Sequence, residues 1–169
     1  GRSALWLAAS RGHSTGVVVL AEHGADLELS CNGMTAAYSA AGLGHTHVLW
    51  MLSQLGANMQ APDANGITPV SIASHQGHLE TVRLLVNLGV DLEAASENGA
   101  TPFWSACHTG HLEVARLLMS RGVDIQAAAR QRTPREIASS GGHAAIVELI
   151  DNHSRGGDRV PVEEPSAPQ

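Results

Sequence analysis

The chain has 169 residues, of which 43% are hydrophobic and only 3% are aromatic. Its ten basic residues, all arginine, and sixteen acidic residues give a net charge of -6. This charge does not favour general binding to nucleic-acid backbones, which needs a basic surface, and no apolar run approaches the roughly 18 residues of a membrane helix. These properties fit one ordinary domain or a short array of repeats.

The dipeptide Gly-His recurs at 12–13, 44–45, 77–78, 110–111 and 142–143, in steps of 32, 33, 33 and 32 residues. Such a regular period predicts stacked structural repeats. We expect five units, at about 1–30, 31–63, 64–96, 97–128 and 129–154. The segment 155–169 is rich in proline, glycine and charge, and this composition predicts disorder.

Each unit begins with a helix whose start and end can be read from the sequence. A serine or threonine caps the free amides at its start, and in the last three units a proline follows in the first helical position. The helix ends at the glycine of Gly-His, because a left-handed residue is least costly there. The capping residues are Ser3, Thr35, Thr68, Thr101 and Thr133.

A second helix follows in each unit, with apolar residues on one face, such as Leu79, Val82, Leu85 and Val86 in the third unit. It stops at a glycine at position 24, 56, 89 or 122, and Ser154 replaces that closing glycine in the fifth unit. A short extended stretch comes next, and Asn-Gly at 32–33, 65–66 and 98–99 predicts a tight turn.

The third unit reads NGITPVSIASHQGHLETVRLLVNLGVDLEA, and this pattern resembles the ankyrin repeat. The resemblance covers residues 1 to about 154 in five copies that share period, caps and glycines. It implies an all-α solenoid of stacked helix-turn-helix units with projecting β-hairpin loops. It further implies a concave face formed by the hairpins and the first helices.

Two positions depart from the family pattern. The family's histidine after Thr-Pro-Leu, which ties the loops of a repeat together, is absent, so we expect weaker units with partial compensation from aromatic packing. The family's hairpin asparagine, a hydroxylation target, is absent too, so that modification is not expected. The first position holds Trp6, Tyr38, Ser71, Trp104 and Glu136, and the second holds Glu28, Gln60, Glu93 and Gln126.

The stretch ACHTGHL, at 106–112, brings together three residues that can bind zinc or act as nucleophile and base. In register, Cys107 falls where neighbouring helices approach closely, which favours a buried filler over an exposed nucleophile. His111 belongs to the repeated Gly-His and is expected to bond loop backbone groups. His108 is free to vary, and a metal shared with His75 is disfavoured because matching positions carry no Asp or Glu. We expect no metal and no cofactor.

The family's groove positions fall on residues that differ between units, and these are the candidate partner-binding residues. The first two units supply Arg2, Ser10, Arg11, Met34 and Leu43, the third supplies Asn65, Ile67, His75 and Gln76, and the fourth supplies Asn98, Ala100, His108 and Thr109. Two other surfaces have open interpretations. Val18 and Trp50 on the second helices could form an apolar contact patch or reflect sequence drift. The arginines at 116, 121, 130, 132 and 135 could attract an acidic partner or form a solvated face.

These observations predict a non-catalytic protein-protein interaction module that binds another protein through the groove and hairpin tips. No phosphate loop, nucleophile elbow or paired-carboxylate motif is present. Two alternatives stay open: a regulatory or targeting segment of a larger enzyme or channel, and a purely structural spacer. We expect a monomer in the cytoplasm or nucleus, with no nucleic-acid partner and no membrane insertion. We also expect further repeats before Gly1, since the first unit does not have a polar cap.

Overall fold

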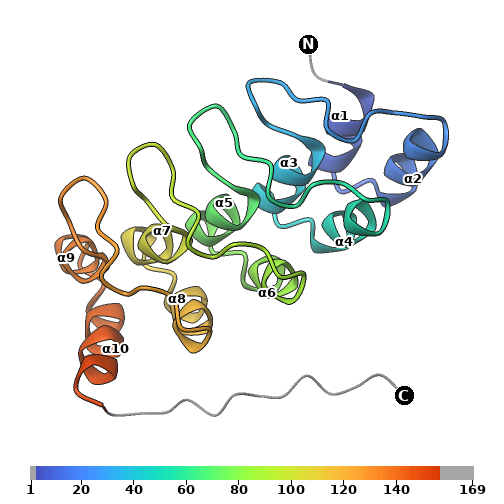
Figure 1. Ribbon diagram of the computed structural model, residues 1–169. Coiled ribbons are helices and arrows are strands. Elements are labelled where there is room, and N and C mark those ends of the chain that lie inside the picture. Colours follow the sequence, from blue (N-terminus) through green and yellow to red (C-terminus); the bar gives the residue numbers. More distant parts are fainter. Residues whose placement is uncertain (1–2, 157–169) are drawn as a thin grey trace, which may run out of the picture.

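A computed structural model describes residues 3–156 as two rows of short helices with hairpin loops projecting to one side (Figure 1). The first helices are α1 (Ala4–Ser10), α3 (Ala36–Gly42), α5 (Pro69–Gln76), α7 (Pro102–Thr109) and α9 (Pro134–Ser140). The second helices are α2 (Ser14–Glu22), α4 (Thr46–Gln54), α6 (Leu79–Asn87), α8 (Leu112–Ser120) and α10 (Ala144–Ser154). Each helix packs on its partner and on its counterpart in the next unit, so the predicted all-α solenoid is confirmed.

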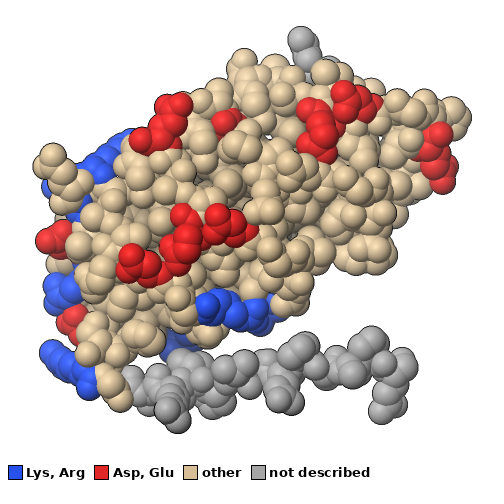
Figure 2. Space-filling model, in the orientation of Figure 1, with Lys and Arg blue, Asp and Glu red and all other residues tan. Residues whose placement is uncertain are grey.

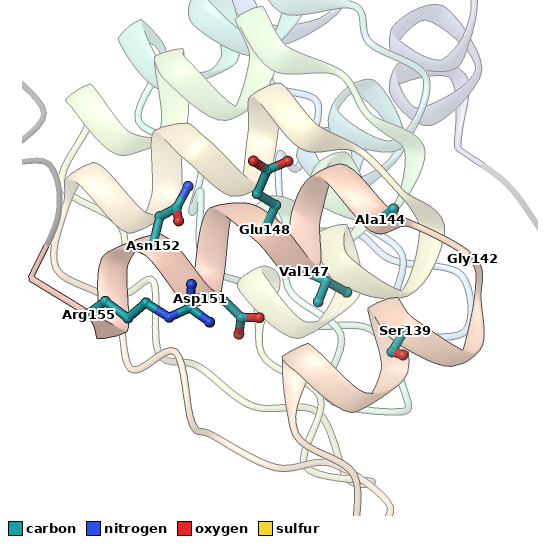
Figure 3. A pocket seen from close by; sticks show the side chains of 8 residues that line it. All are labelled: Ser139, Gly142, Ala144, Val147, Glu148, Asp151, Asn152 and Arg155. Atoms are coloured by element: carbon teal, nitrogen blue, oxygen red, sulfur yellow. The ribbon is translucent and has the colours of Figure 1, made fainter.

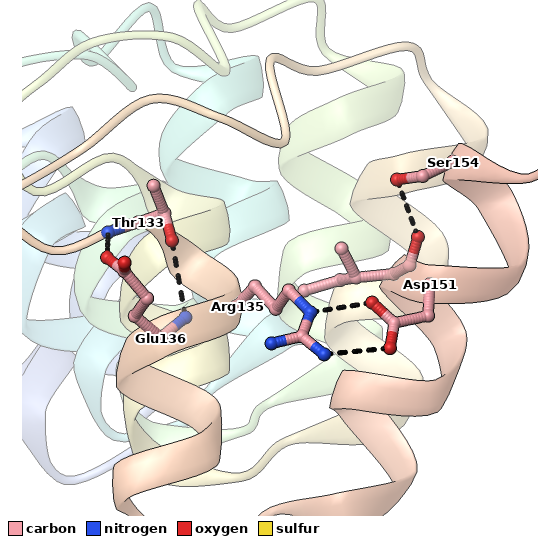
Figure 4. A network of polar contacts seen from close by, with 6 residues as sticks. Thr133, Arg135, Glu136, Asp151 and Ser154 are labelled. Atoms are coloured by element: carbon pink, nitrogen blue, oxygen red, sulfur yellow. Dashed lines mark hydrogen bonds and ion pairs between the residues drawn. The ribbon is translucent and has the colours of Figure 1, made fainter.

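The first helices begin as the sequence predicts. In all five, the hydroxyl of the capping serine or threonine accepts a hydrogen bond from the backbone N–H three residues later. In α9 the cap is reciprocal: Glu136 also accepts a bond from the Thr133 N–H at 2.8 Å (Figure 4). Glu136 stands where the family pattern has histidine, so here that position stabilises the helix start instead.

Small residues on the first helices let neighbouring units approach closely. Ala9, Ala41, Ala73 and Ala106 are all 0% exposed, and the second helices bury valine, leucine or isoleucine. Phe103 is the largest fully buried side chain. The core is therefore a continuous strip along the array, built from modest side chains, and its packing fixes the spacing between units.

The histidine of each Gly-His links its unit to the preceding one. The Nε2–H of His78 donates to the Gly42 carbonyl at 3.1 Å, and His111 donates to the His75 carbonyl at 3.0 Å. The expectation that this ring bonds a loop was wrong, because its acceptor lies at the end of the preceding first helix. His45 and His143 make the same bond, to Ser10 and His108.

The ring of that histidine also covers the turn glycine of the preceding unit. A Cβ atom added to Gly44 would lie 2.8 Å from Nδ1 of His78, and one added to Gly110 would lie 2.5 Å from Nδ1 of His143. The turn glycines also have positive φ, 72° at Gly44 and 83° at Gly110. Glycine is therefore required twice, for its left-handed backbone and for the space that the next unit fills.

A second ladder joins the loops that follow the second helices. The Glu or Gln at the position of the missing family asparagine accepts a hydrogen bond from a backbone N–H in the next unit. The pairs are Glu28 with Asn58 at 2.7 Å, Gln60 with Asp91 at 2.9 Å, and Glu93 with Asp124 at 2.7 Å. A longer acidic or amide side chain thus makes an inter-unit bond at this position.

The hairpins differ in length by one residue, and this changes their turns. In the short hairpins two successive residues have positive φ: Asn32 and Gly33 in one, and Arg130 and Gln131 in the other. The last hairpin thus makes the same turn with Arg130 and Gln131, although its sequence has no Asn-Gly. In a longer hairpin, Asp63 Oδ1 instead accepts the N–H groups two and four residues later, each at 2.9 Å.

The end of the array departs from the sequence expectation. Ser154 does not replace the closing glycine, because α10 is 11 residues long, compared with 9 in α8, and Gly156 takes the left-handed turn at φ 79°. On the same unit Arg135 forms two hydrogen bonds to Asp151, at 2.6 and 2.9 Å (Figure 4). The pair lowers the pKa of Asp151 and raises that of Arg135.

The contact between Gly110 and His143 can be tested against a matched site. We predict that Gly110→Ala lowers the free energy of unfolding by roughly 2–4 kcal/mol, from backbone strain plus the clash with the His143 ring. Gly142→Ala has the same kind of backbone strain, at φ 76°, but no atom within 4 Å of the new Cβ among the described residues. It should cost about 1 kcal/mol. Urea unfolding measures both, and equal costs would show that the ring contact contributes nothing.

Candidate functional site

The candidate site centres on the last turns of the first helices, which we call the groove row: Ser10, Arg11, Leu43, His75, Gln76, His108 and Thr109. Arg11, Leu43, Gln76 and His108 are exposed, with Leu43 at 53%, and the other three are partly buried. Their side chains therefore remain accessible beside a fully buried helix core. Arg2 lies outside the described residues.

The scaffold holds the backbone of the groove row rather than its side chains. The carbonyls that accept the Gly-His rings belong to Ser10, Gly42, His75 and His108, three of which are groove-row residues. The inter-unit contact thus fixes where each of these residues sits. Because only the backbone carbonyl takes part, the side chain of such a residue can differ between units without loss of the contact.

The centre of the groove row is a cluster of three rings. The ring centroids of His75 and His108 lie 6.2 Å apart, and that of His108 lies 5.1 Å from Trp104. Trp104 is itself buried, and its indole N–H donates to the Arg132 carbonyl at 3.0 Å, which fixes the ring beneath His108. Burial, and then the nearby His108 and His111, lower the pKa of His75 below its ordinary value.

The hairpin candidates divide by exposure. Asn65 is exposed and Ile67 and Met34 are partly buried. Ala100 is only 9% exposed, so its side chain offers little surface to a partner, contrary to the expectation for that position. The exposed Asn98 is engaged within its own loop, where its Oδ1 accepts bonds from Ser96 Oγ and the Ala100 N–H.

Two hydroxyl groups of the groove row are also engaged locally. Ser10 Oγ donates to the Leu7 carbonyl at 3.0 Å, and Thr109 Oγ1 donates to the Ser105 carbonyl at 2.9 Å. Serine and threonine on a helix often donate to a carbonyl three or four residues earlier, so the sequence could have predicted these bonds as an alternative to partner binding. A partner that used these hydroxyls as donors would have to replace the bonds.

Sequence reasoning missed how Tyr38 and Trp104 replace the family histidine. Tyr38 Oη donates to Asp63 at 3.3 Å, and Trp104 bonds the hairpin before α9, so each aromatic residue ties its helix to the following hairpin. Burial, and then the carboxylate of Asp63, raise the pKa of Tyr38 to about 12. An aromatic residue in place of the family histidine is visible in the sequence. Its hydrogen-bond partner lies 25 or 28 residues away, so the bond itself could not be predicted from the local pattern.

The ACHTGHL stretch divides into separate roles. Cys107 is 0% exposed, and burial raises the pKa of its thiol to about 12, which disfavours the thiolate that a nucleophile needs. His111 bonds the preceding unit, and only His108 faces solvent. Within residues 3–156, no three His, Cys, Asp or Glu side chains are grouped so as to hold a metal ion.

A shallow pocket of about 430 Å³ lies elsewhere, on the outer face of α10 (Figure 3). Ser139, Val147 and Asp151 line it, and their counterparts one unit earlier, Cys107, Ala115 and Met119, are buried against the next unit. The pocket is therefore the outer stacking face of the last helix pair.

The second helices carry a face of their own. Trp50 is 45% exposed and its ring stacks on His47, and Val19 on the neighbouring helix is 46% exposed, while Val18 is partly buried. On α6 and α8 the same face carries ion pairs, Arg83 with Glu80 and Arg116 with Glu113. The view in Figure 2 shows basic residues mainly toward the α9–α10 end and acidic residues across the middle of the molecule.

Comparison with known proteins identifies one family. A family model described as "Ankyrin repeats (3 copies)" matches residues 1–63 and 54–129, which together cover 129 of the 169 residues. No curated protein matches the chain in a sequence search. None of the helices within residues 3–156 has the length and apolar character needed to cross a bilayer.

The Tyr38 environment predicts a measurable titration. The chain has one tyrosine, so ultraviolet absorbance reports Tyr38 alone, and we expect a midpoint near pH 12 in the folded protein and about 10 in denaturant. Because the folded pKa is raised, the stability contributed is complete below pH 10 and falls as pH rises toward 12. Asp63→Asn should lower the midpoint only in part, since burial is the larger cause. A folded midpoint near 10 would contradict the described contact.

The two cysteines should differ in reactivity. Cys31 is partly exposed and Cys107 is buried, so we expect a disulfide reagent to label Cys31 at least about a hundredfold faster. Both thiols should react at similar rates in denaturant. Cys31→Ser provides the matched control, leaving only the slow phase. Rapid labelling of this variant would show that Cys107 is accessible, and it would then be a candidate nucleophile.

Proposed function

The chain belongs to the ankyrin-repeat family, whose repeats are generally protein-protein interaction modules, and on that premise we propose that it binds a partner protein through the groove row and the exposed hairpin residues. The fold alone does not select a partner, because function on such a scaffold lies in the side chains that it presents. The proposal therefore depends on particular surface positions.

One observation supports it: the residue just before the turn glycine differs in every unit, while the glycine and histidine that follow it are the same in all five. That residue is Arg11, Leu43, Gln76, Thr109 or Gly141, and it is exposed in all units but the fourth. The buried alanine two or three places earlier and the following Gly-His recur throughout. A scaffold role would favour one residue at this position, whereas recognition of a particular surface needs different ones.

The inter-unit bonds support binding without large rearrangement. The groove-row backbone is fixed by the histidine rings, so ordering it costs little when a partner arrives. The ring of His108 contacts that of Trp104, and the ring of His75 lies beside His108, so this part of the groove row combines aromatic and polar character, as binding hot spots often do. These features favour a pre-formed surface over an induced one.

We further propose that the array acts without catalysis, as a monomer, in the cytoplasm or nucleus. The buried, high-pKa Cys107 and the structural role of His111 leave ACHTGHL no working nucleophile-base pair. The net charge of -6 argues against a nucleic-acid partner. The same groove would serve in a targeting or regulatory segment of a larger enzyme or channel.

The proposal is tested by affinity capture with matched variants. We expect the triple variant His75→Ala/Gln76→Ala/His108→Ala to lose at least one protein captured by the native chain. Arg83→Ala/Arg116→Ala, which changes exposed residues on the second helices, should retain it. Photo-crosslinkers at Gln76 and at Arg83 would then locate the contact. If every captured protein survives the triple variant and crosslinks only at Arg83, the groove row is not the binding surface.

A further inference from the structure

We propose that the groove row takes an extended acidic segment of its partner, whose carboxylates are read by His75 and His108. The inference rests on the proposed function and adds the chemical class of the partner. It is carried by the distribution of charge over the described residues and by the geometry of the two histidines.

Carboxylates are absent from the groove row, although acidic residues outnumber basic ones in the chain, sixteen to ten. The carboxylates of residues 3–156 lie on the second helices, the loops after them, the hairpins and the start of α9. They are, in that order, Glu22, Glu80, Glu113, Glu148 and Asp151; Asp26, Glu28, Asp91, Glu93 and Asp124; Asp63 and Glu97; and Glu136.

Of the three carboxylates closest in sequence to the groove elements, two accept hydrogen bonds within the protein. Asp63 accepts bonds from Tyr38 Oη and from two backbone N–H groups, and Glu136 accepts the Thr133 N–H of its capping box. Glu97 lies on the exposed part of the hairpin before α7. A partner carboxylate in the groove row would therefore meet no carboxylate within that row.

Cationic side chains, by contrast, mark both ends of the groove. Exposed Arg11 follows α1, and exposed Arg130 and Arg132 lie on the hairpin before α9. Arg132 is steadied by a bond from its Nη1 to Ser140 Oγ at 3.3 Å. Between these ends stand His75 and His108, with ring centroids 6.2 Å apart, close enough for one carboxylate to approach both.

The surroundings of the two histidines explain why an anion would be favoured. His75 has His108 opposite it on α7 and His111 at the following turn, and α3 ends beside it in the uncharged Leu43. His108 has His143 bonded to its carbonyl, and α9 and its hairpin add Arg132 and Glu136. Burial, and then the neighbouring rings of His108 and His111, lower the pKa of His75, so a bound carboxylate would raise it again.

The size of the groove sets the length of the segment. Packed helices lie roughly 8–10 Å apart, so the five first helices from α1 to α9, which carry the groove row and the arginines at its ends, span about 32–40 Å. An extended chain rises about 3.3 Å per residue, so a segment of about twelve residues would follow the whole row. A folded partner could present such a segment as a loop or a terminus.

The test uses three twelve-residue peptides that differ only in charge, (Glu-Ser)6, (Gln-Ser)6 and (Lys-Ser)6, with affinity measured by fluorescence anisotropy. We expect (Glu-Ser)6 to bind most tightly, and its affinity to rise at least about threefold from pH 7.5 to pH 5.5 as the histidines gain protons. The double variant His75→Gln/His108→Gln should weaken it about fivefold at pH 5.5, whereas Arg83→Gln/Arg116→Gln should not.

Nuclear magnetic resonance of the histidine rings provides a second readout. Addition of (Glu-Ser)6 should raise the pKa of His75 and shift the ring resonances of His75 and His108, and it should leave the ring resonances of His47, on the opposite row of helices, unchanged. Equal binding of the three peptides, preference for (Lys-Ser)6, or no effect of the double histidine variant would overturn the inference. A groove-dependent partner that docks through a neutral or basic segment would also overturn it, while leaving the proposed function intact.

Discussion

The contact between a histidine ring and the turn glycine of the preceding unit is the constraint on which the array depends. The ring lies over a glycine that has no side chain, and its Nε2–H donates to a carbonyl at the end of the preceding first helix. A larger residue at the glycine would displace the ring, and loss of the ring would leave a carbonyl without its partner. Gly-His is therefore one interaction divided between two units.

This division explains how the scaffold and the surface coexist in so short a repeat. The ring of His111 holds the backbone of His75, and the ring of His143 holds that of His108. Because the bond is to the backbone, the side chain of the held residue is free to serve recognition. The repeated histidine thus fixes the backbone of a position whose own residue changes between units, Ser10, Gly42, His75 and His108.

Much of the fold follows from the sequence because its signals are local. A hydroxyl cap, a proline in the first turn and a glycine at the end act within a few residues, and the period places them in phase. What the sequence did not show depends on the neighbouring unit. The acceptor of the His111 ring, the burial of Ala100 and the bond from Tyr38 to Asp63 all arise from stacking. The two extra residues of α10, His153 and Ser154, do not follow from the repeat spacing, because the left-handed glycine that ends this helix is Gly156, two positions later than in the other units.

The last unit shows what happens where stacking stops within the described residues. An inner unit buries Phe103 and Met119 against its neighbour, and the equivalent residues of the last unit are Arg135 and Asp151. An exposed ion pair adds little to stability, so the charged residues at these positions are better explained by the absence of an apolar surface there. Apolar side chains on the outer face would present a stacking surface to any similar unit, including another copy of the chain. The paired charges make that face costly to dehydrate, so the end of the last unit is poorly suited to a partner, in keeping with the proposal that a partner binds the groove row.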